Sequence, residues 1–274
     1  MTSLGMKNLA DQFARDGYFT PVPVLTREET QSFRSAFDDF YGRNKARLAG
    51  LPAREQAQVL SETHICFEWV YHLASHPRVL DTVEAILGED LLIWGSRWFT
   101  KMPGDRTYVS WHQDGTYWGL HPPNVITAWM ALSDSNPENG CMRVIPGTHR
   151  AGTLPQVETN APDNALSRGQ EIAVEVDEAQ AVNLTLQPGQ MSLHHIGIVH
   201  GSKVNTSDKP RIGIAVRYIT PEVVQDAVEH PWAMLVRGSD RLKHFEHVPA
   251  PTGDQPELQA RAVERMMSSV LQRP

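Results

Sequence analysis

Two histidines and an aspartate are the residues best suited to chemistry in this chain. His112 and Asp114 stand two positions apart in the segment YVSWHQDG, and residues i and i+2 of a strand point to the same face. An imidazole and a carboxylate would therefore enter one cavity together. His200, at the end of the apolar segment GIVH, offers a third ligand on a later strand. Two histidines and one carboxylate predict the facial triad of a non-heme Fe(II) oxygenase, which leaves coordination positions free.

An arginine downstream of the last histidine extends this interpretation. Arg211 follows His200 after the polar segment NTSDKP (205–210), which is typical of a turn between two strands. Such a hairpin would bring Arg211 beside the metal side of the cavity. A buried guanidinium needs a carboxylate partner and binds one through two parallel hydrogen bonds. The pattern fits 2-oxoglutarate, with its distal carboxylate on Arg211 and its keto-acid end on the metal. Taken alone, Arg211 would be better explained by a salt bridge at the rim, and it is the combination with His112, Asp114 and His200 that favours the cosubstrate.

The elements that must position these residues change in character near residue 90. From 91 to 220, short apolar or alternating runs are separated by Pro, Gly, Asn and Asp. Runs of this length with turn residues between them predict an antiparallel sandwich or jelly roll. The acidic, polar segment 155–180 is expected to be a long excursion between strands. Whether it closes as a lid stays open.

The flanking parts of the chain are expected to be helical. Within residues 1–90, apolar side chains recur at helical spacing, and Thr26 with Glu29 predicts a capping box at a helix start. Residues 221–274 return to helical spacing. We therefore expect one domain over 1–274, a mainly β fold with flanking helices.

Composition limits the classes of partner. The chain has 274 residues with 25 Lys+Arg and 32 Asp+Glu, a net charge of −7, and this acidity argues against nucleic acid as a partner. No apolar run approaches the roughly 18 residues of a membrane helix, and the N-terminal segment does not resemble a signal peptide. Cys66 and Cys141 are too few for a disulfide framework. We expect a cytoplasmic protein that acts on a small molecule; the oligomeric state is left open.

Several motifs together resemble one family. The segments WHQDGTYWG (111–119), NGCMRVIPGTH (139–149) and HHIGIVHGS (194–202) look like those of the phytanoyl-CoA dioxygenase family of Fe(II)/2-oxoglutarate oxygenases. The opening DGYFTPVPVLTREE (16–29) is similar as well, and the resemblance runs from about residue 10 to 220. It implies a double-stranded β-helix core of the jelly-roll, cupin-like type, and an enzyme that uses Fe(II), 2-oxoglutarate and O₂.

The resemblance also implies a role for each matching metal ligand. His112, Asp114 and His200 would bind the iron. Relatives that halogenate replace the carboxylate by alanine or glycine, so the presence of Asp114 favours hydroxylation. The expected reaction is hydroxylation of an unactivated C–H bond, with decarboxylation of 2-oxoglutarate to succinate.

Four further residues match cosubstrate positions of the family. Arg211 and Ser202 would hold the distal carboxylate of 2-oxoglutarate. Trp129 matches a tryptophan that lines the cosubstrate site, and Gln113 matches a glutamine that adjoins the metal.

The substrate is the least determined part of the prediction. Arg97 and Lys101 share one face of a strand and would bind an anionic group if that face looks inward. Tyr117 and Trp118 are candidates for a cage around an amine, and His195 is a further candidate beside the site. Burial in the core or contact with solvent is the alternative for each of these residues. No basic cluster suits a coenzyme A phosphate, so a small polar metabolite is the expected substrate.

Two other functions fit parts of the same pattern. The same cofactors would serve desaturation, cyclisation or epimerisation, which only product analysis separates from hydroxylation. A cupin-like metal or binding protein without oxygenase activity would keep the triad but would not need Arg211 and Ser202.

Overall fold

The computed structural model describes residues 3–271 except 160, 162, 167–168 and 227. Its helices are α1 (Ser3–Asp16), α2 (Arg27–Leu48), α3 (Ala53–Val59), α4 (Thr63–Cys66), α5 (Glu68–Ala74), α6 (Pro77–Leu87), α7 (Gly115–Trp118) and α8 (Glu257–Leu271). Its strands are β1 (Tyr18–Pro23), β2 (Leu91–Lys101), β3 (Val109–His112), β4 (Leu120–His121), β5 (Val125–Ala131), β6 (Met142–Ile145), β7 (Gln156–Glu158), β8 (Gln170–Ile172), β9 (Val182–Asn183), β10 (Gln190–His195), β11 (Val199–Ser202), β12 (Arg211–Ile219), β13 (Val224–Gln225), β14 (Trp232–Arg237) and β15 (Glu246–His247).

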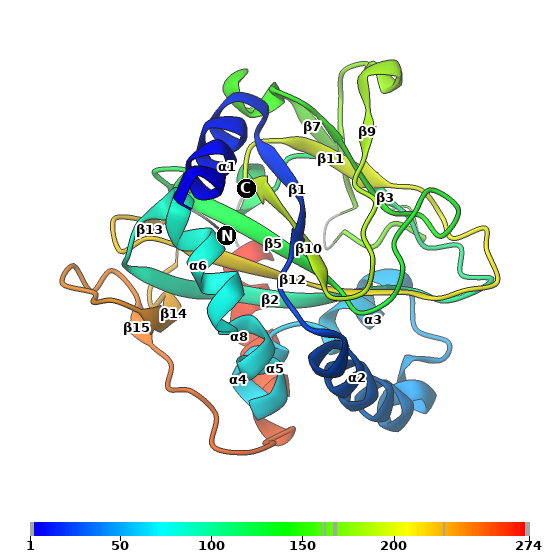
Figure 1. The fold of residues 1–274 in the computed structure, drawn as a ribbon. Helices are drawn as coiled ribbons and strands as arrows, with labels where there is room; N and C mark the ends of the chain where they lie inside the picture. The colour runs from blue at the N-terminus through cyan, green and yellow to red at the C-terminus, as the bar shows by residue number, and fades with distance from the viewer. Residues whose placement is uncertain (1–2, 160, 162, 167–168, 227, 272–274) are drawn as a thin grey trace.

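Two sheets form the centre of the molecule (Figure 1). The larger sheet has the order β1-β10-β5-β12-β2-β14-β15, and the smaller has the order β3-β11-β6-β9. Neighbouring strands are antiparallel except β14 and β15, which are parallel. This arrangement confirms the predicted mainly β fold with a jelly-roll core and flanking helices.

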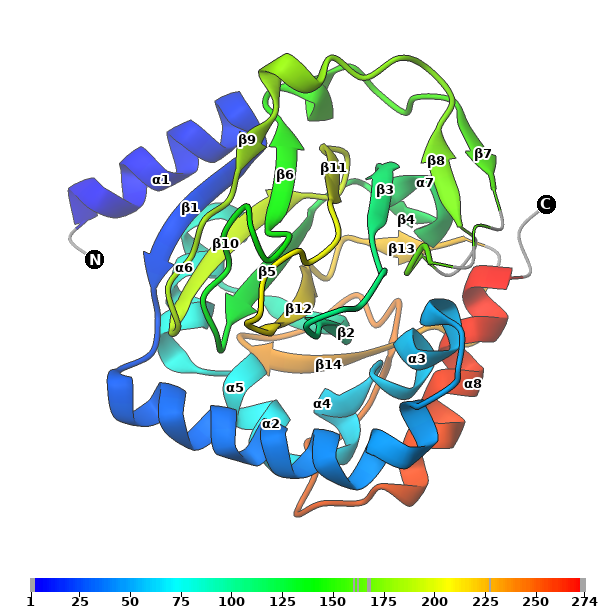
Figure 2. The ribbon, with the colours of Figure 1, turned by 90° about the vertical axis from the view of Figure 1, so that its right-hand side faces the viewer.

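Helices cover the face of the larger sheet that is turned away from the smaller sheet. Figure 2 shows α2, α4, α5 and α8 on that side. The two faces of β12 explain this packing, because side chains alternate along a strand. Ile212, Ile214, Val216 and Tyr218 are buried in the main hydrophobic core with residues of the helices. The alternate positions, including Arg211, Ala215 and Arg217, line a cavity between the sheets.

Aromatic side chains fasten α2 to the larger sheet. Phe37 is fully buried, and its ring centroid lies 4.6 Å from that of Trp98 on β2. Burial of one such ring stabilises the fold by roughly 1.5–3 kcal/mol. The predicted capping box is also present: the Thr26 hydroxyl accepts from the Glu29 amide, and the Glu29 carboxylate accepts from the Thr26 amide. The start of α2, and so its position on the sheet, is therefore fixed by local sequence.

The prediction of a helical segment over 221–274 is wrong for its first part. β13, β14 and β15 precede α8, and β14 pairs with β2 in the larger sheet. The physical reason is an apolar strand face: Met234 is 2% exposed and belongs to the main core. Only the last part of the segment is the expected helix.

The excursion over 155–180 contains the hairpin β7–β8. Within this excursion, Leu166 and Gln170 line the cavity between the sheets.

Among the described residues, every helix is too short or too polar to span a membrane.

Candidate active site

The three predicted metal ligands come from the smaller sheet and the turn that follows it. His112 is the last residue of β3, and it pairs directly with His200 on β11. Asp114 does not continue the strand as predicted: it is the N-cap residue of the short helix α7, with φ −60° and ψ −40°. Its carboxylate makes no capping hydrogen bond. It is turned instead toward the two histidines, so the structure brings the three side chains together.

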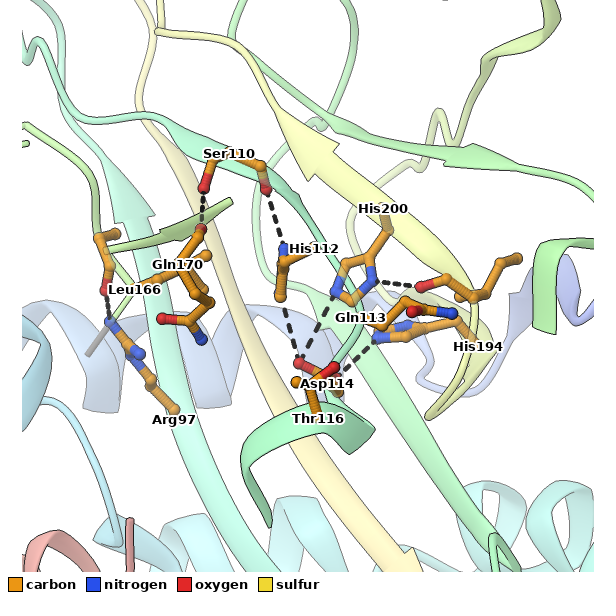
Figure 3. A network of polar contacts seen from close by, with 12 residues as sticks. Arg97, Ser110, His112, Gln113, Asp114, Thr116, Leu166, Gln170, His194 and His200 are labelled. Atoms are coloured by element: carbon orange, nitrogen blue, oxygen red, sulfur yellow. Dashed lines mark hydrogen bonds and ion pairs between the residues drawn. The ribbon is translucent and has the colours of Figure 1, made fainter. Parts of the chain in front are cut away.

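Both imidazoles present the same nitrogen to Asp114 (Figure 3). The Nδ1 atom of His112 lies 2.9 Å from the Ser110 carbonyl, and that of His200 lies 3.0 Å from the Ile198 carbonyl. A carbonyl partner fixes the proton on Nδ1 and leaves Nε2 as a ligand atom. The Nε2 atoms lie 3.3 Å and 4.0 Å from Asp114 Oδ1, and the potential ligand atoms all lie within 4.8 Å of one another.

The protonation states also suit a metal. Burial raises the pKa of Asp114, but the three histidines around it, His200, His112 and His194, outweigh burial and hold that pKa well below its usual range. Burial lowers the pKa of His200 well below its usual value. A carboxylate beside a neutral imidazole is the form in which these groups bind divalent ions.

The guanidinium of Arg211 lies at another part of the same cavity. It is 3% exposed, and its Nη1 donates to the Gly140 carbonyl. Its Nε has no hydrogen-bond partner among the described residues, and burial lowers its pKa to about 10, which keeps it charged. A buried charge without a counter-ion is costly. The distal carboxylate of 2-oxoglutarate would supply the missing counter-ion, so the residues present suit the predicted cofactor.

The predicted hairpin between His200 and Arg211 is wrong. β11 belongs to the smaller sheet and β12 to the larger, so the segment between them crosses from one sheet to the other. Asn205 holds this crossing: its amide donates to the carbonyls of Lys101 and Lys209 at 2.9 and 2.8 Å. The arginine reaches the cavity from the sheet opposite the metal ligands.

Lys101 lies beside Ser202. Its Nζ donates to the Ser202 hydroxyl at 2.7 Å and to the Lys203 carbonyl. Burial, with repulsion from Arg211, lowers the pKa of Lys101 to about 5. Ser202 itself lines the cavity. Lys101 therefore contacts the serine predicted to bind the cosubstrate and does not itself line the cavity, and its contact with substrate stays a prediction.

Trp129 lines the cavity next to Arg211, whose guanidinium carbon lies 5.3 Å from its ring centroid. Gln113, in contrast, does not line the cavity between the sheets. Its amide nitrogen donates to the carbonyls of Gly152 and Gly197, and its oxygen accepts from the Leu154 amide. These hydrogen bonds connect the backbone segments around the site, and the cofactor role of Gln113 stays a prediction.

The remaining substrate candidates divide between the cavity and other places. Arg97 and Trp118 line the cavity. His195 does not line the cavity: its ring centroid lies 6.3 Å from that of Phe13 and 5.1 Å from that of His149, and its substrate role stays a prediction. The side chain of Tyr117 lies outside the described residues.

Several residues of the cavity were not predicted from the sequence, among them His194, Arg217 and Thr127. His194 Nε2 lies 3.7 Å from Asp114 Oδ2, while Arg217 and Thr127 line the cavity from β12 and β5. The alternation of β12 places Arg217 on the face of Arg211, and this is the signal that was available. His194 and His195 are adjacent, and only the register of β10 decides which of them enters the cavity.

Comparison with known proteins agrees with this geometry. The family model of phytanoyl-CoA dioxygenase (PhyH) matches residues 13–213. The ectoine dioxygenase of Nocardia farcinica is 28% identical over 240 residues, 81% of this chain and 79% of that protein. Peroxisomal phytanoyl-CoA dioxygenase of Bos taurus is 23% identical, over 75% of this chain and 66% of its own length. The solved structure of the non-heme monooxygenase ThoJ without ligand is 34% identical, with a TM-score of 0.80 over 97% of this chain and 100% of that one. The chain belongs to the phytanoyl-CoA dioxygenase family.

Proposed function

We propose that the protein is an Fe(II)/2-oxoglutarate-dependent dioxygenase that hydroxylates an unactivated C–H bond of a small polar metabolite. Its second product is succinate, formed by decarboxylation of 2-oxoglutarate. The observation that carries the proposal is one cavity containing both the convergent His112, Asp114 and His200 and the unpaired guanidinium of Arg211.

Each residue has a task that follows from its position. His112, Asp114 and His200 hold the metal from one side and leave its cavity side open. Bound together, iron and 2-oxoglutarate supply the activation of O₂ and the oxidation of the substrate. Arg211 and Ser202 orient the cosubstrate from its far end. The cavity walls exclude water from the reacting atoms.

A small polar substrate suits the cavity. Together with the open solvent at its mouth, it offers about 640 Å³ of space free of protein atoms, and the metal and 2-oxoglutarate would fill part of that space. Apolar and charged side chains alternate in its lining, including Phe99, Leu166, Arg97 and Arg217. The similarity to ectoine dioxygenases, which are named for a small-molecule substrate, supports this choice. Desaturation, cyclisation and epimerisation use the same residues, and product analysis would identify them.

Anaerobic absorption spectroscopy tests the cofactor part of the proposal. Fe(II) and then 2-oxoglutarate are added to metal-free protein, and a weak visible band is expected only after both additions. His200→Ala should abolish the band, and Arg211→Ala should raise the 2-oxoglutarate concentration that it requires by about tenfold or more, as loss of a charged hydrogen-bonding pair predicts. Arg34→Ala, on the outer helix α2, is the matched control.

Absence of the band in folded wild-type protein would contradict the proposal. Succinate release with a panel of metabolites, followed by mass spectrometry, tests hydroxylation: a product heavier by one oxygen atom is expected. A product that has lost two hydrogen atoms, or one of unchanged mass, would overturn hydroxylation in favour of another outcome.

A further inference from the structure

Two arginines face the cavity far from Arg211. Arg97 on β2 pairs with Ala215 on β12, and Arg217 pairs with Gly95, so the two arginines are diagonal neighbours on one face. Such positions lie roughly 7–8 Å apart. Arg217 is six residues from Arg211 along one extended strand, about 20 Å at roughly 3.3 Å per residue. One small cosubstrate held by Arg211 would leave this pair of arginines free for another ligand.

Three polar atoms at this end of the cavity have no hydrogen-bond partner among the described residues. The Nε atoms of Arg97 and Arg217 and the hydroxyl of Thr127 are buried without a hydrogen bond among the described residues. Thr127 pairs with Arg217 across β5 and β12, so its hydroxyl lies on the same face. Arg97 donates to the Ala165 carbonyl. No ion pair within 4.0 Å joins either arginine to a carboxylate in the described part of the chain.

Aromatic rings hold both guanidiniums in place. The guanidinium carbon of Arg97 lies 4.7 Å from the ring centroid of Phe99, and that of Arg217 lies 5.2 Å from the ring centroid of Trp118. The Trp118 ring in turn lies 4.9 Å from Trp94. A guanidinium fixed by stacking keeps its planar edge free for a bidentate partner. The two arginines are therefore held ready for a ligand.

The balance of charge indicates the sign of that ligand. Three guanidiniums line the cavity, and Asp114 is the one carboxylate among its described lining residues. The three guanidiniums and one carboxylate leave an excess of two positive charges in the cavity. Fe(II) and 2-oxoglutarate carry opposite and equal charges, so their binding leaves this positive excess unchanged. Metal binding also engages Asp114, which otherwise attracts both Arg97 and Arg217. A neutral substrate that displaced water from this end would leave buried positive charge without compensation.

One buried acid, Glu62, lies outside the cavity near this pair of arginines. The carboxylate of Glu62 fills the space beside Gly95, where an added Cβ would lie 3.1 Å from Glu62 Oε1. Glu62 is 3% exposed and does not line the cavity, and burial raises its pKa to about 8. Even when ionised, the Glu62 carboxylate compensates only one of the two excess positive charges. At least one positive charge still faces the cavity.

We propose that Arg97 and Arg217 form a substrate subsite that binds a carboxylate, with the Thr127 hydroxyl as a further contact, so that the substrate is a small carboxylic acid. The subsite rests on the proposed function, because the substrate must share the cavity with 2-oxoglutarate. Arg217 determines specificity, since a planar carboxylate can accept two hydrogen bonds from its fork.

Binding of matched acids and amides tests this subsite. Protein loaded anaerobically with Fe(II) and saturating 2-oxoglutarate is titrated, by calorimetry, with small monocarboxylates from propionate to benzoate and with the primary amide of each. The acids should bind about tenfold to a hundredfold more tightly than their amides, the range expected for hydrogen bonds to a charged group. Arg217→Gln should remove most of this preference, and Arg97→Gln should weaken it.

Control variants keep the result interpretable. Arg217→Lys retains the charge and should keep part of the preference, while Arg34→Gln on α2 should behave as wild type. Equal binding of acids and amides by wild type, or an unchanged preference in both glutamine variants, would overturn the subsite. The 2-oxoglutarate band measured on the same samples separates the two proposals: its absence contradicts the cofactor assignment, and its presence without acid preference contradicts the subsite alone.

Discussion

The indole of Trp129 lies over Gly213 on the neighbouring strand: a Cβ at Gly213 would lie 2.3 Å from Trp129 Cζ2 and 2.8 Å from the Met130 carbonyl. Gly213 is two residues after Arg211, so the missing side chain lets the tryptophan lie beside the guanidinium predicted to bind 2-oxoglutarate.

Gly213→Ala should therefore weaken 2-oxoglutarate binding. The added methyl group displaces the indole or the strand, and a shift of this kind costs about 1–3 kcal/mol, or roughly tenfold to a hundredfold in affinity. Titration of the Fe(II) protein with 2-oxoglutarate measures the change. Gly42→Ala is the control, because a Cβ there meets no atom within 4 Å. An unchanged affinity in Gly213→Ala would show that the Trp129 ring is free to move.

Gln113→Leu should lower stability more than metal affinity. The substitution leaves the carbonyls of Gly152 and Gly197 and the Leu154 amide without their present partner, at a cost of about 1–3 kcal/mol per group that stays unsatisfied. Thermal unfolding and Fe(II) titration of the same samples measure the two effects. A large loss of metal affinity in a variant of unchanged stability would support Gln113 as a direct metal neighbour.

Glu62→Gln should change how stability depends on pH. Burial raises the pKa of Glu62 from its ordinary value of 4.5 to about 8 in the folded protein. Between these values the folded state holds a proton that the unfolded state releases, so this group makes the fold less stable as pH rises. The slope is at most about 1.4 kcal/mol per pH unit. The variant should gain stability relative to wild type from pH 5 to pH 8, measured by urea unfolding.

The control for this variant is Ser35→Ala, at an exposed position of α2 that carries no titratable group. Its stability difference from wild type should stay nearly constant over the same range. If the Glu62→Gln difference were also constant, the carboxyl of Glu62 would not titrate differently on folding.

Metal addition should stabilise the protein through the triad. A ligand that binds only the folded state at a concentration a hundredfold above its Kd adds about 2.7 kcal/mol. Ni(II), which is redox-stable in air, should raise the unfolding temperature of wild type, and chelation should reverse the change. In Asp114→Ala the rise should be much smaller. An equal rise in that variant would place the metal elsewhere.

His112 and Asp114 could be predicted from their two-residue spacing, although Asp114 begins a short helix rather than continuing the strand. Arg211 could be predicted from its place after His200, although the segment between them joins two sheets and is not a hairpin. Thr127 and Arg217 could not be linked in this way, because their contact depends on the register between β5 and β12. The sequence favoured His195 over His194 as a site residue for the same reason: the choice depends on strand register, and a shift of one residue exchanges the two faces of a strand. The β14 strand was missed because its short apolar pattern is ambiguous outside the context of the sheet.

The assignment of β11 and β12 to different sheets has a mechanical consequence. The metal ligands belong to one half of the sandwich, and Arg211 belongs to the other. A cofactor held at both ends is therefore a cross-link between the two halves, and its binding should slow amide hydrogen exchange in β11 and β12 together. Departure of succinate, the shorter product, would release that cross-link once in every turnover.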